Sequence, residues 1–264
     1  MDHHRGRDCG QRPQGPLILA FTTLHPETAV VCALAVAILM GAVSAAVTGF
    51  GFSLVSAPMF ILLLGAGHGV RLGNMFSCLV SAIGVWSVRR VMEPRTAATL
   101  IAPAMVVTPL AAVLVNRLDR NVVMIIAGVV TVVSVLVIWR GFRFPRLRGV
   151  PGLIAAASTS AAMNVLSSLS GPPIALYSVN AGWSPERLRR VSQPYFFLLN
   201  LAAVASLGPL LLPVPVAALL IGCGVVGFAS GRRLAPRLDV DVVRRVVLLV
   251  AGAGGLAAII RGAL

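Results

Sequence analysis

The polar residues that could do chemistry in this 264-residue chain gather around two short interruptions of apolar sequence. The interruptions are Gly49-Phe50-Gly51-Phe52 and Ser170-Gly171-Pro172-Pro173. Proline lacks a backbone N–H and glycine relaxes the backbone, so each interruption leaves peptide groups without helical partners. Lipid cannot pair with such groups, which are tolerated only in protein or beside a watery cavity. We therefore expect a solute site between the two interruptions.

The candidate binding residues are all neutral. The selected set is Gly49, Gly51, Ser53, Asn74, Ser77, Ser170, Gly171, Pro172, Pro173, Gln193 and Asn200. Hydroxyl and amide groups, with free backbone N–H groups at half-helix N-termini, suit a small anion without a buried cation. For any single serine, the alternative is a hydrogen bond between packed helices. Asn74 and Gln193 follow the two interruptions at similar distances, and Asn200 lies deeper in its segment.

Enzymatic and metal-dependent chemistry has little support in the sequence. All eight acidic residues lie in the tail, in connectors or at segment ends, so no buried carboxylate pair or proton relay is indicated. The four cysteines show neither CxxC spacing nor a nearby histidine cluster. We expect no catalytic residue, no metal ligand and no cofactor.

Composition indicates a multi-pass membrane protein. The chain is 58% hydrophobic and only 11% charged, whereas about a quarter of an ordinary soluble domain is charged. Its net charge of +14 would suit nucleic-acid binding, but every basic residue is an arginine and the arginines cluster between apolar segments. That distribution is typical of cytoplasmic loops and argues against a nucleic-acid partner.

The order of segments predicts a duplicated all-helical fold. We divide the chain into a disordered tail (1–28), a first membrane repeat (29–139), a basic cytoplasmic connector (140–149) and a second membrane repeat (150–264). Each repeat begins with a broken stretch, 29–64 or 150–181, followed by three apolar segments. The predicted segments are 72–88, 97–115 and 122–139 in the first repeat, and 194–212, 214–231 and 241–260 in the second.

Charge placement favours inverted repeats. If each broken stretch crosses once, the halves are parallel and the arginines near positions 187–190 and 232–237 lie outside, against the positive-inside bias. If each is a reentrant hairpin, these clusters share the cytoplasmic side with Arg89, Arg90, Arg95 and residues 140–148. Both chain termini then lie outside.

The two interruptions carry a family resemblance. The stretch 41–58, with Gly49-Phe50-Gly51-Phe52-Ser53 and Pro58, resembles the first signature of the TauE/SafE family of sulfite-exporter-like membrane proteins. The stretch 170–177, followed by Gly182-Trp183-Ser184 and Arg189, resembles its repeated counterpart. The resemblance covers nearly the whole chain after residue 29. The chain differs from many members in having a single Gly51 between two phenylalanines and Ser170 before Gly-Pro-Pro.

The resemblance implies a transporter of a small, often sulfur-containing anion such as sulfite or a sulfonate, in a bacterial-type inner membrane. We expect alternating access around the two helix breaks. An anion channel is the first alternative, and a membrane-embedded enzyme or an assembly subunit are others. Besides the anionic solute and the lipid bilayer, the expected partners include a coupling ion, proton or sodium. Without a buried carboxylate, proton coupling would have to use the substrate's own protonation or water.

Overall fold

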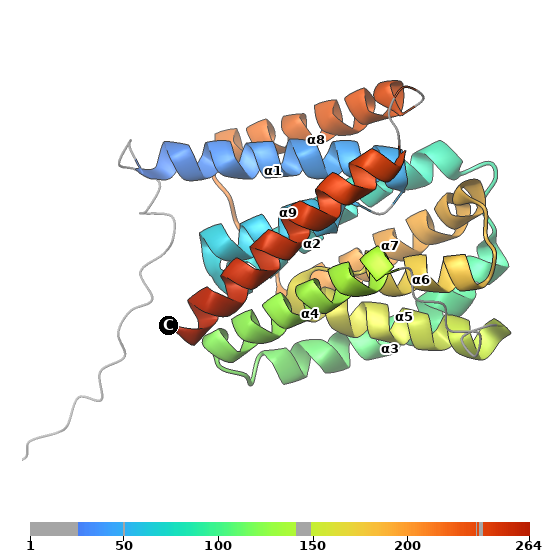
Figure 1. Ribbon diagram of the computed structural model, residues 1–264, viewed down its shortest axis with the longest axis horizontal. Helices are drawn as coiled ribbons and strands as arrows, with labels where there is room; N and C mark the ends of the chain where they lie inside the picture. The colour runs from blue at the N-terminus through green and yellow to red at the C-terminus, as the bar shows by residue number, and fades with distance from the viewer. Residues whose placement is uncertain (1–25, 50, 141–148, 236, 238–239) are drawn as a thin grey trace, which may run out of the picture.

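The computed structural model describes residues 26–49, 51–140, 149–235, 237 and 240–264, and their regular structure is entirely helical (Figure 1). Seven of the described helices are long and apolar enough to cross a membrane. The expected all-helical polytopic membrane architecture is confirmed. The helices are α1 (Pro26–Thr48), α2 (Phe52–Val88), α3 (Pro94–Val115), α4 (Arg120–Arg140), α5 (Gly149–Ser167), α6 (Gly171–Asn180), α7 (Pro185–Leu207), α8 (Val214–Leu234) and α9 (Val240–Ala263).

The chain reverses direction at both interruptions. A Cβ on Gly41 of α1 would lie 3.0 Å from the carbonyl oxygen of Phe52. Ser160 of α5 donates a hydrogen bond to the carbonyl oxygen of Ser170 at 2.6 Å. Residues this far apart along a straight helix would be separated by about 15 Å. Each broken stretch is therefore a helical hairpin with its interruption at the tip.

A second reversal occurs inside α2, at Gly65. Gly65 has φ +78° and ψ 166°, a conformation that glycine adopts at no steric cost. A Cβ on Gly69 would lie 2.6 Å from the carbonyl oxygen of Phe60, so the two parts of α2, 52–64 and 66–88, fold back against each other. The predicted arm and following segment are both present, but the second part begins at 66 rather than 72.

Helix α7 begins nine residues before the predicted segment 194–212, and it ends five residues earlier. Ser184 caps it by accepting a hydrogen bond from the backbone N–H of Arg187 at 3.2 Å. Pro185 and Glu186 follow, which are favourable residues for a first helical turn. The arginines expected in a connector therefore lie on the first turns of a helix. At the other end the chain leaves the helix at Gly208, whose φ is +81°.

The predicted tail and connector fall largely outside the described residues. Of the tail 1–28, residues 1–25 are outside, whereas 26–28 form the start of α1, so the tail ends earlier than predicted. Of the connector 140–149, residues 141–148 are outside. Arg140 ends α4 and Gly149 begins α5.

The two halves share one register along most of their length. Equivalent helix ends lie 119 residues apart: Thr48 and Ser167, Phe52 and Gly171, Val88 and Leu207, Val115 and Leu234. Gly65 and Ser184, which precede the second part of α2 and α7, have the same separation. The duplication inferred from segment order thus extends to individual residues.

Helix packing follows the same duplication. Helix α1 packs against α8, and its counterpart α5 packs against α3, the counterpart of α8. Helix α4 packs against its own counterpart α9, and α2 packs against α7. This is the pairing expected of two halves related by a two-fold axis. Whether the halves are inverted across a membrane stays a prediction.

Glycines bring α8 close to α1. A Cβ on Gly227 would lie 2.6 Å from the carbonyl oxygen of Leu39, and one on Gly231 would lie 2.8 Å from that of Val43. The two glycines form a GxxxG pattern, which allows helix backbones to approach in a membrane. This contact fixes α1 and therefore the position of the first break.

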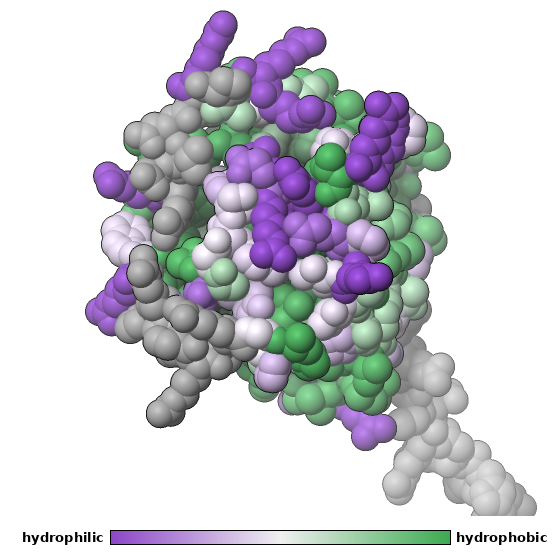
Figure 2. Space-filling view, turned by 90° about the vertical axis from the view of Figure 1, so that its right-hand side faces the viewer, coloured by the Kyte–Doolittle hydropathy of each residue, from purple (hydrophilic) through white to green (hydrophobic). Residues whose placement is uncertain are grey.

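Exposed arginines gather at one end of the bundle. Figure 1 shows the ends of α2, α4, α6 and α8 and the starts of α3, α5, α7 and α9 at its right-hand end, with the start of α1 and the end of α9 at the left. Figure 2 shows hydrophilic side chains across the right-hand face and hydrophobic ones on its flank. We call this face the basic end. Its exposed arginines include Arg89, Arg90, Arg95, Arg140, Arg187, Arg190, Arg232, Arg233 and Arg237.

We predict that the basic end lies in the cytoplasm and that both termini lie outside, because cytoplasmic loops retain arginine. A phosphatase fused after Leu264 should be active, and a fluorescent protein fused there should be dark. The same reporters inserted between Arg89 and Glu93 should give the opposite result. A fluorescent C-terminal fusion would contradict the inverted arrangement.

We predict that Gly227→Ala lowers the thermal midpoint of the purified protein, whereas Gly222→Ala on the same helix does not. Both changes improve helix propensity. The added methyl group meets α1 only at Gly227, since a Cβ on Gly222 would have no atom within 4 Å. Overpacking of this kind costs about 1–3 kcal/mol. Equal midpoints for the two variants would show that α1 and α8 do not pack this closely.

Candidate functional site

A small polar cavity lies between the two interruptions. Its volume is ≈ 20 Å³, slightly more than one water molecule requires. The lining residues come from both halves: Ala45, Gly49, Phe52, Ser53, Ser77, Val80, Ser81, Ser170, Gln193, Phe196 and Asn200. We call this space the central cavity.

The selected candidate residues divide into two groups. Those that line the central cavity are Gly49, Ser53, Ser77, Ser170, Gln193 and Asn200. Gly51, Asn74, Gly171, Pro172 and Pro173 do not line it. Gly51 faces α1, where an added Cβ would lie 2.0 Å from Ser44 Oγ. Gly171 and Pro172 are buried in the first turn of α6.

Two buried helix N-termini meet at the central cavity. Helix α2 starts at Phe52 and α6 starts at Gly171, and neither cap residue, Gly51 or Ser170, forms a side-chain capping hydrogen bond. The first N–H groups of a helix lack intrahelical partners and carry partial positive charge. Helices that begin inside the protein thus direct two positive ends toward one space.

Hydroxyl and amide groups complete the lining. Ser53 Oγ and Ser77 Oγ lie 3.2 Å apart and share a hydrogen bond between the two parts of α2. Asn200 projects from α7 and is 1% exposed. The side chains facing the cavity can therefore donate several hydrogen bonds, and no acidic residue is among those that line it.

Gln193 ties α7 of the second half to the break of the first half. Its Nε2 donates to the carbonyl oxygen of Gly49 at 2.8 Å. Gly49 has φ +90°, so its carbonyl is turned out of the α1 hydrogen-bond pattern. Gly84 allows Gln193 to fit, since a Cβ there would lie 2.0 Å from Gln193 Oε1. The amide thus satisfies a carbonyl that the break would otherwise leave unpaired.

Arg189 caps the end of α1 at the same break. Its Nη2 donates to the carbonyl oxygens of Ala46, at 3.1 Å, and Val47. The last carbonyls of a helix lack intrahelical donors and carry partial negative charge, so a guanidinium is a favourable partner. Since Arg189 is half-buried and extends from α7, it also fixes the two halves against each other.

Asn74 belongs to a second polar cluster with Asn164 and Asn200. Asn164 Nδ2 donates to Asn74 Oδ1 at 2.7 Å and to Asn200 Oδ1 at 3.3 Å. The sequence-predicted site residues do not include Asn164, although it is the single amide side chain in the run 150–169 and lies six residues before the interruption that starts at Ser170. That position, within two turns of an interruption, is the sequence signal for it.

Four apolar residues close the central cavity, and none of them was among the site residues predicted from the sequence. They are Ala45, Phe52, Val80 and Phe196, and Ser81 adds a further hydroxyl. Phe50 lies outside the described residues. The aromatic rings and the valine restrict the space, so the cavity is too small for an anion larger than water without a rearrangement.

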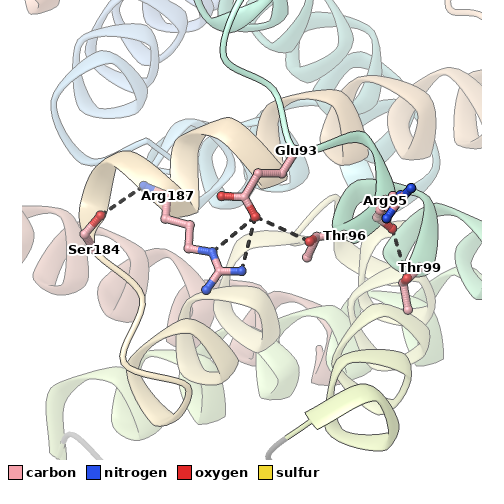
Figure 3. A network of polar contacts seen from close by, with 6 residues as sticks. All are labelled: Glu93, Arg95, Thr96, Thr99, Ser184 and Arg187. Atoms are coloured by element: carbon pink, nitrogen blue, oxygen red, sulfur yellow. Dashed lines mark hydrogen bonds and ion pairs between the residues drawn. The ribbon is translucent and has the colours of Figure 1, made fainter.

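The basic end holds a wider hollow and an ion pair between the halves. The hollow has a volume of ≈ 680 Å³, and Arg95, Tyr177 and Trp183 are among its lining residues. Beside it, Glu93 Oε2 accepts hydrogen bonds from Arg187 Nε and Nη2, both at 3.2 Å (Figure 3). Glu93 lies before α3 of the first half and Arg187 lies on α7 of the second.

Within the described ranges, no group of three or more His, Cys, Asp or Glu side chains is placed to hold a metal ion. The buried polar side chains among the described residues carry hydroxyl or amide groups. These can bind an ion or a small polar solute through hydrogen bonds or oxygen ligands.

The chain matches one family of known proteins. The family model for the sulfite exporter TauE/SafE matches residues 18–258. Neither the curated proteins nor the solved structures gave a significant match. The family match includes both interruptions, the basic midpoint and every described helix in whole or in part. The chain therefore belongs to the TauE/SafE sulfite exporter family of membrane transporters.

Proposed function

We propose that the protein is a secondary transporter of a small oxyanion, with sulfite or a sulfonate as the substrate class, and that it works by alternating access around the two breaks. The observation that carries this proposal is the central cavity, which both halves line and which both helix N-termini reach. The substrate class follows from membership of the TauE/SafE family.

The chemistry of the central cavity suits an anion. The N-termini of α2 and α6 supply partial positive charge, and the backbone N–H groups come mainly from α2, because Pro172 and Pro173 in the first turn of α6 have none. Ser53, Ser77, Gln193 and Asn200 supply donors that match the several acceptor oxygens of a small oxyanion. Because no charged side chain lines the cavity, binding stays weak enough for release, as transport requires.

The basic end favours arrival of an anion from one side. Its exposed arginines produce a positive potential that raises the local concentration of anions. The hollow beside Arg95 and Arg187 opens on this face and provides space for a hydrated ion. By the positive-inside bias, this face is cytoplasmic in a bacterial-type inner membrane.

Alternating access is favoured over an open channel because the central cavity is closed. It has room for about one water molecule between Phe52, Val80 and Phe196. Gln193 of the second half holds the first break, so a rocking motion of the halves would change that contact. The second break is held within its own hairpin by Ser160. The ion pair Glu93–Arg187 would then hold the halves together at the basic end.

We predict that Gln193→Ala and Asn200→Ala each lower sulfite flux about 10-fold or more at sub-saturating sulfite, because a hydrogen bond to a charged group contributes about 1.5–3 kcal/mol. Flux is measured with labelled sulfite in proteoliposomes and compared with sulfonate and thiosulfate. Ser230→Ala is the control, since this hydroxyl donates to Val226 on the exposed part of α8.

Unchanged flux in both amide variants would remove the central cavity from the transport path. Saturable flux that follows an imposed gradient supports a transporter. Unitary conductance steps in a planar bilayer would instead identify an anion channel.

We predict that Glu93→Arg slows transport and that the exchange Glu93→Arg with Arg187→Glu restores it. The two side chains are 32% and 46% exposed, so the pair contributes about 0.2–1 kcal/mol to stability and the thermal midpoint should change little. A bias of that size in a two-state equilibrium still changes populations by up to about 5-fold. Failure of the double exchange to restore flux would show that the pair does not control the conformational equilibrium.

A further inference from the structure

Three asparagine side chains meet in the interior beside the central cavity. They come from α2 (Asn74), α5 (Asn164) and α7 (Asn200) and are at most 1% exposed. Asn74 Nδ2 donates to the carbonyl oxygen of Val70 at 2.9 Å, and Asn200 Nδ2 donates to that of Phe196 at 2.7 Å. Both side chains therefore direct their Oδ1 atoms toward Asn164. We call this group the asparagine cluster.

Two buried oxygens at this place have no partner. Asn164 Oδ1 and Ser168 Oγ form no hydrogen bond, and both residues are 0% exposed. Ser168 packs against the neighbour of Asn74, because a Cβ on Gly73 would lie 2.5 Å from Ser168 Oγ. An unpaired buried polar atom is costly, so an unfilled partner such as an ion or a water molecule is the usual explanation.

We propose that the asparagine cluster binds a sodium ion. Rotation of the Asn164 amide by 180° about its last side-chain bond exchanges Nδ2 for Oδ1. The Oδ1 atoms of Asn74, Asn164 and Asn200 then converge, an arrangement that is repulsive unless a cation lies between them. The hydroxyl of Ser168, which is one turn beyond Asn164, is the candidate fourth ligand.

The surroundings select a monovalent cation. Asn164 lies in the last turn of α5, where the C-terminal carbonyls carry partial negative charge. Amide, hydroxyl and carbonyl oxygens are hard ligands that suit Na⁺. All of the candidate ligands are neutral, so a divalent ion would keep an uncompensated charge in the interior. The hydrogen-bond distances of 2.7 Å and 3.3 Å show that the three amides are closely packed, so the oxygens would have to separate less around Na⁺ than around the larger K⁺.

The common register explains why the cluster and the cavity differ. The positions 119 residues from Asn74, Asn164 and Asn200 are Gln193, Ala45 and Ser81, and all three line the central cavity. A methyl group at Ala45 leaves open the space that the Asn164 amide fills in the equivalent place. Two equivalent sets of positions, each drawn from both halves, thus form the cavity in one place and the asparagine cluster in the other.

The position of the cluster would couple sodium to the anion, an aspect that rests on the proposed function. Asn200 belongs to both the asparagine cluster and the central cavity. It accepts a hydrogen bond from Asn164, and it lines the cavity. A cation there would supply the positive charge that the cavity lacks. Asn74 belongs to the first half, and Asn164 and Asn200 belong to the second. A cation bound to the asparagine cluster would therefore also stabilise one arrangement of the halves.

The test measures thermal unfolding of the purified full-length protein in NaCl, KCl or choline chloride at constant ionic strength. We expect Na⁺ at about 100-fold above its Kd to raise the midpoint by about 5 °C or more over choline, and K⁺ to give a much smaller rise. Equilibrium dialysis of the parent protein with ²²Na⁺ should give about one ion per chain. No rise with Na⁺, or an equal rise with K⁺, would overturn the assignment.

Variants separate cation binding from a purely structural role. Asn164→Ala should abolish the Na⁺-dependent rise. Asn164→Asp removes the donated hydrogen bonds and adds an oxygen ligand, so it should be less stable in choline and show an equal or larger rise with Na⁺. The control is Asn180→Asp, which changes a buried amide of α6 outside the cluster. Its thermal midpoint should show no larger rise with Na⁺ than that of the parent protein. A Na⁺ response that persists in Asn164→Ala would refute the site.

Flux measurements distinguish this inference from the proposed function. Sulfite flux that is equal in sodium and choline, together with absent ²²Na⁺ binding, would overturn the sodium site and leave the transporter intact. Sodium binding that depends on Asn164, without flux of any tested anion, would support the site and contradict the proposed function.

Discussion

The need to pair backbone groups inside a membrane governs this structure. Two helices end and two begin within the bundle, where lipid offers no hydrogen bonds. The protein satisfies several of these groups with side chains: Gln193 and Arg189 bind the end of α1, and Ser160 binds the carbonyl of Ser170. The N-termini of α2 and α6 are left uncapped by side chains, and the central cavity lies beside them. The central cavity thus lies where side chains no longer form hydrogen bonds with the backbone groups of the breaks.

The sequence predicted those parts of the fold that depend on local chemistry. Glycine and proline marked both breaks, and arginine clusters marked one end of the bundle. The start of α7 was placed wrongly because hydropathy treats Arg187, Arg189 and Arg190 as a connector, whereas the capping residues Ser184 and Pro185 begin a helix there. The reversal at Gly65 was implied by the separate segments, but its tightness depends on how Gly69 contacts Phe60.

The site was harder to predict, because its geometry depends on contacts between distant segments. Asn164 donates a hydrogen bond to Asn74 although the two residues are 90 positions apart in the sequence, and the neighbouring sequence of neither residue indicates the other. The central cavity likewise depends on a small residue, Ala45, which carries no chemical signal. Polar residues near the breaks could be selected from sequence, but their division between cavity and asparagine cluster required the three-dimensional structure.

The common register of the two halves has a consequence for conformational exchange. Because equivalent helix ends share one register, from Thr48 to Val115 and from Ser167 to Leu234, each half could adopt the shape of the other. In such an exchanged state Asn74 would take the place of Gln193 and donate to the carbonyl of Ser168, as Gln193 now donates to Gly49. That step would release Asn164 from Asn74. The conformation of each half in this structure is therefore a guide to the conformation of the other half in the exchanged state.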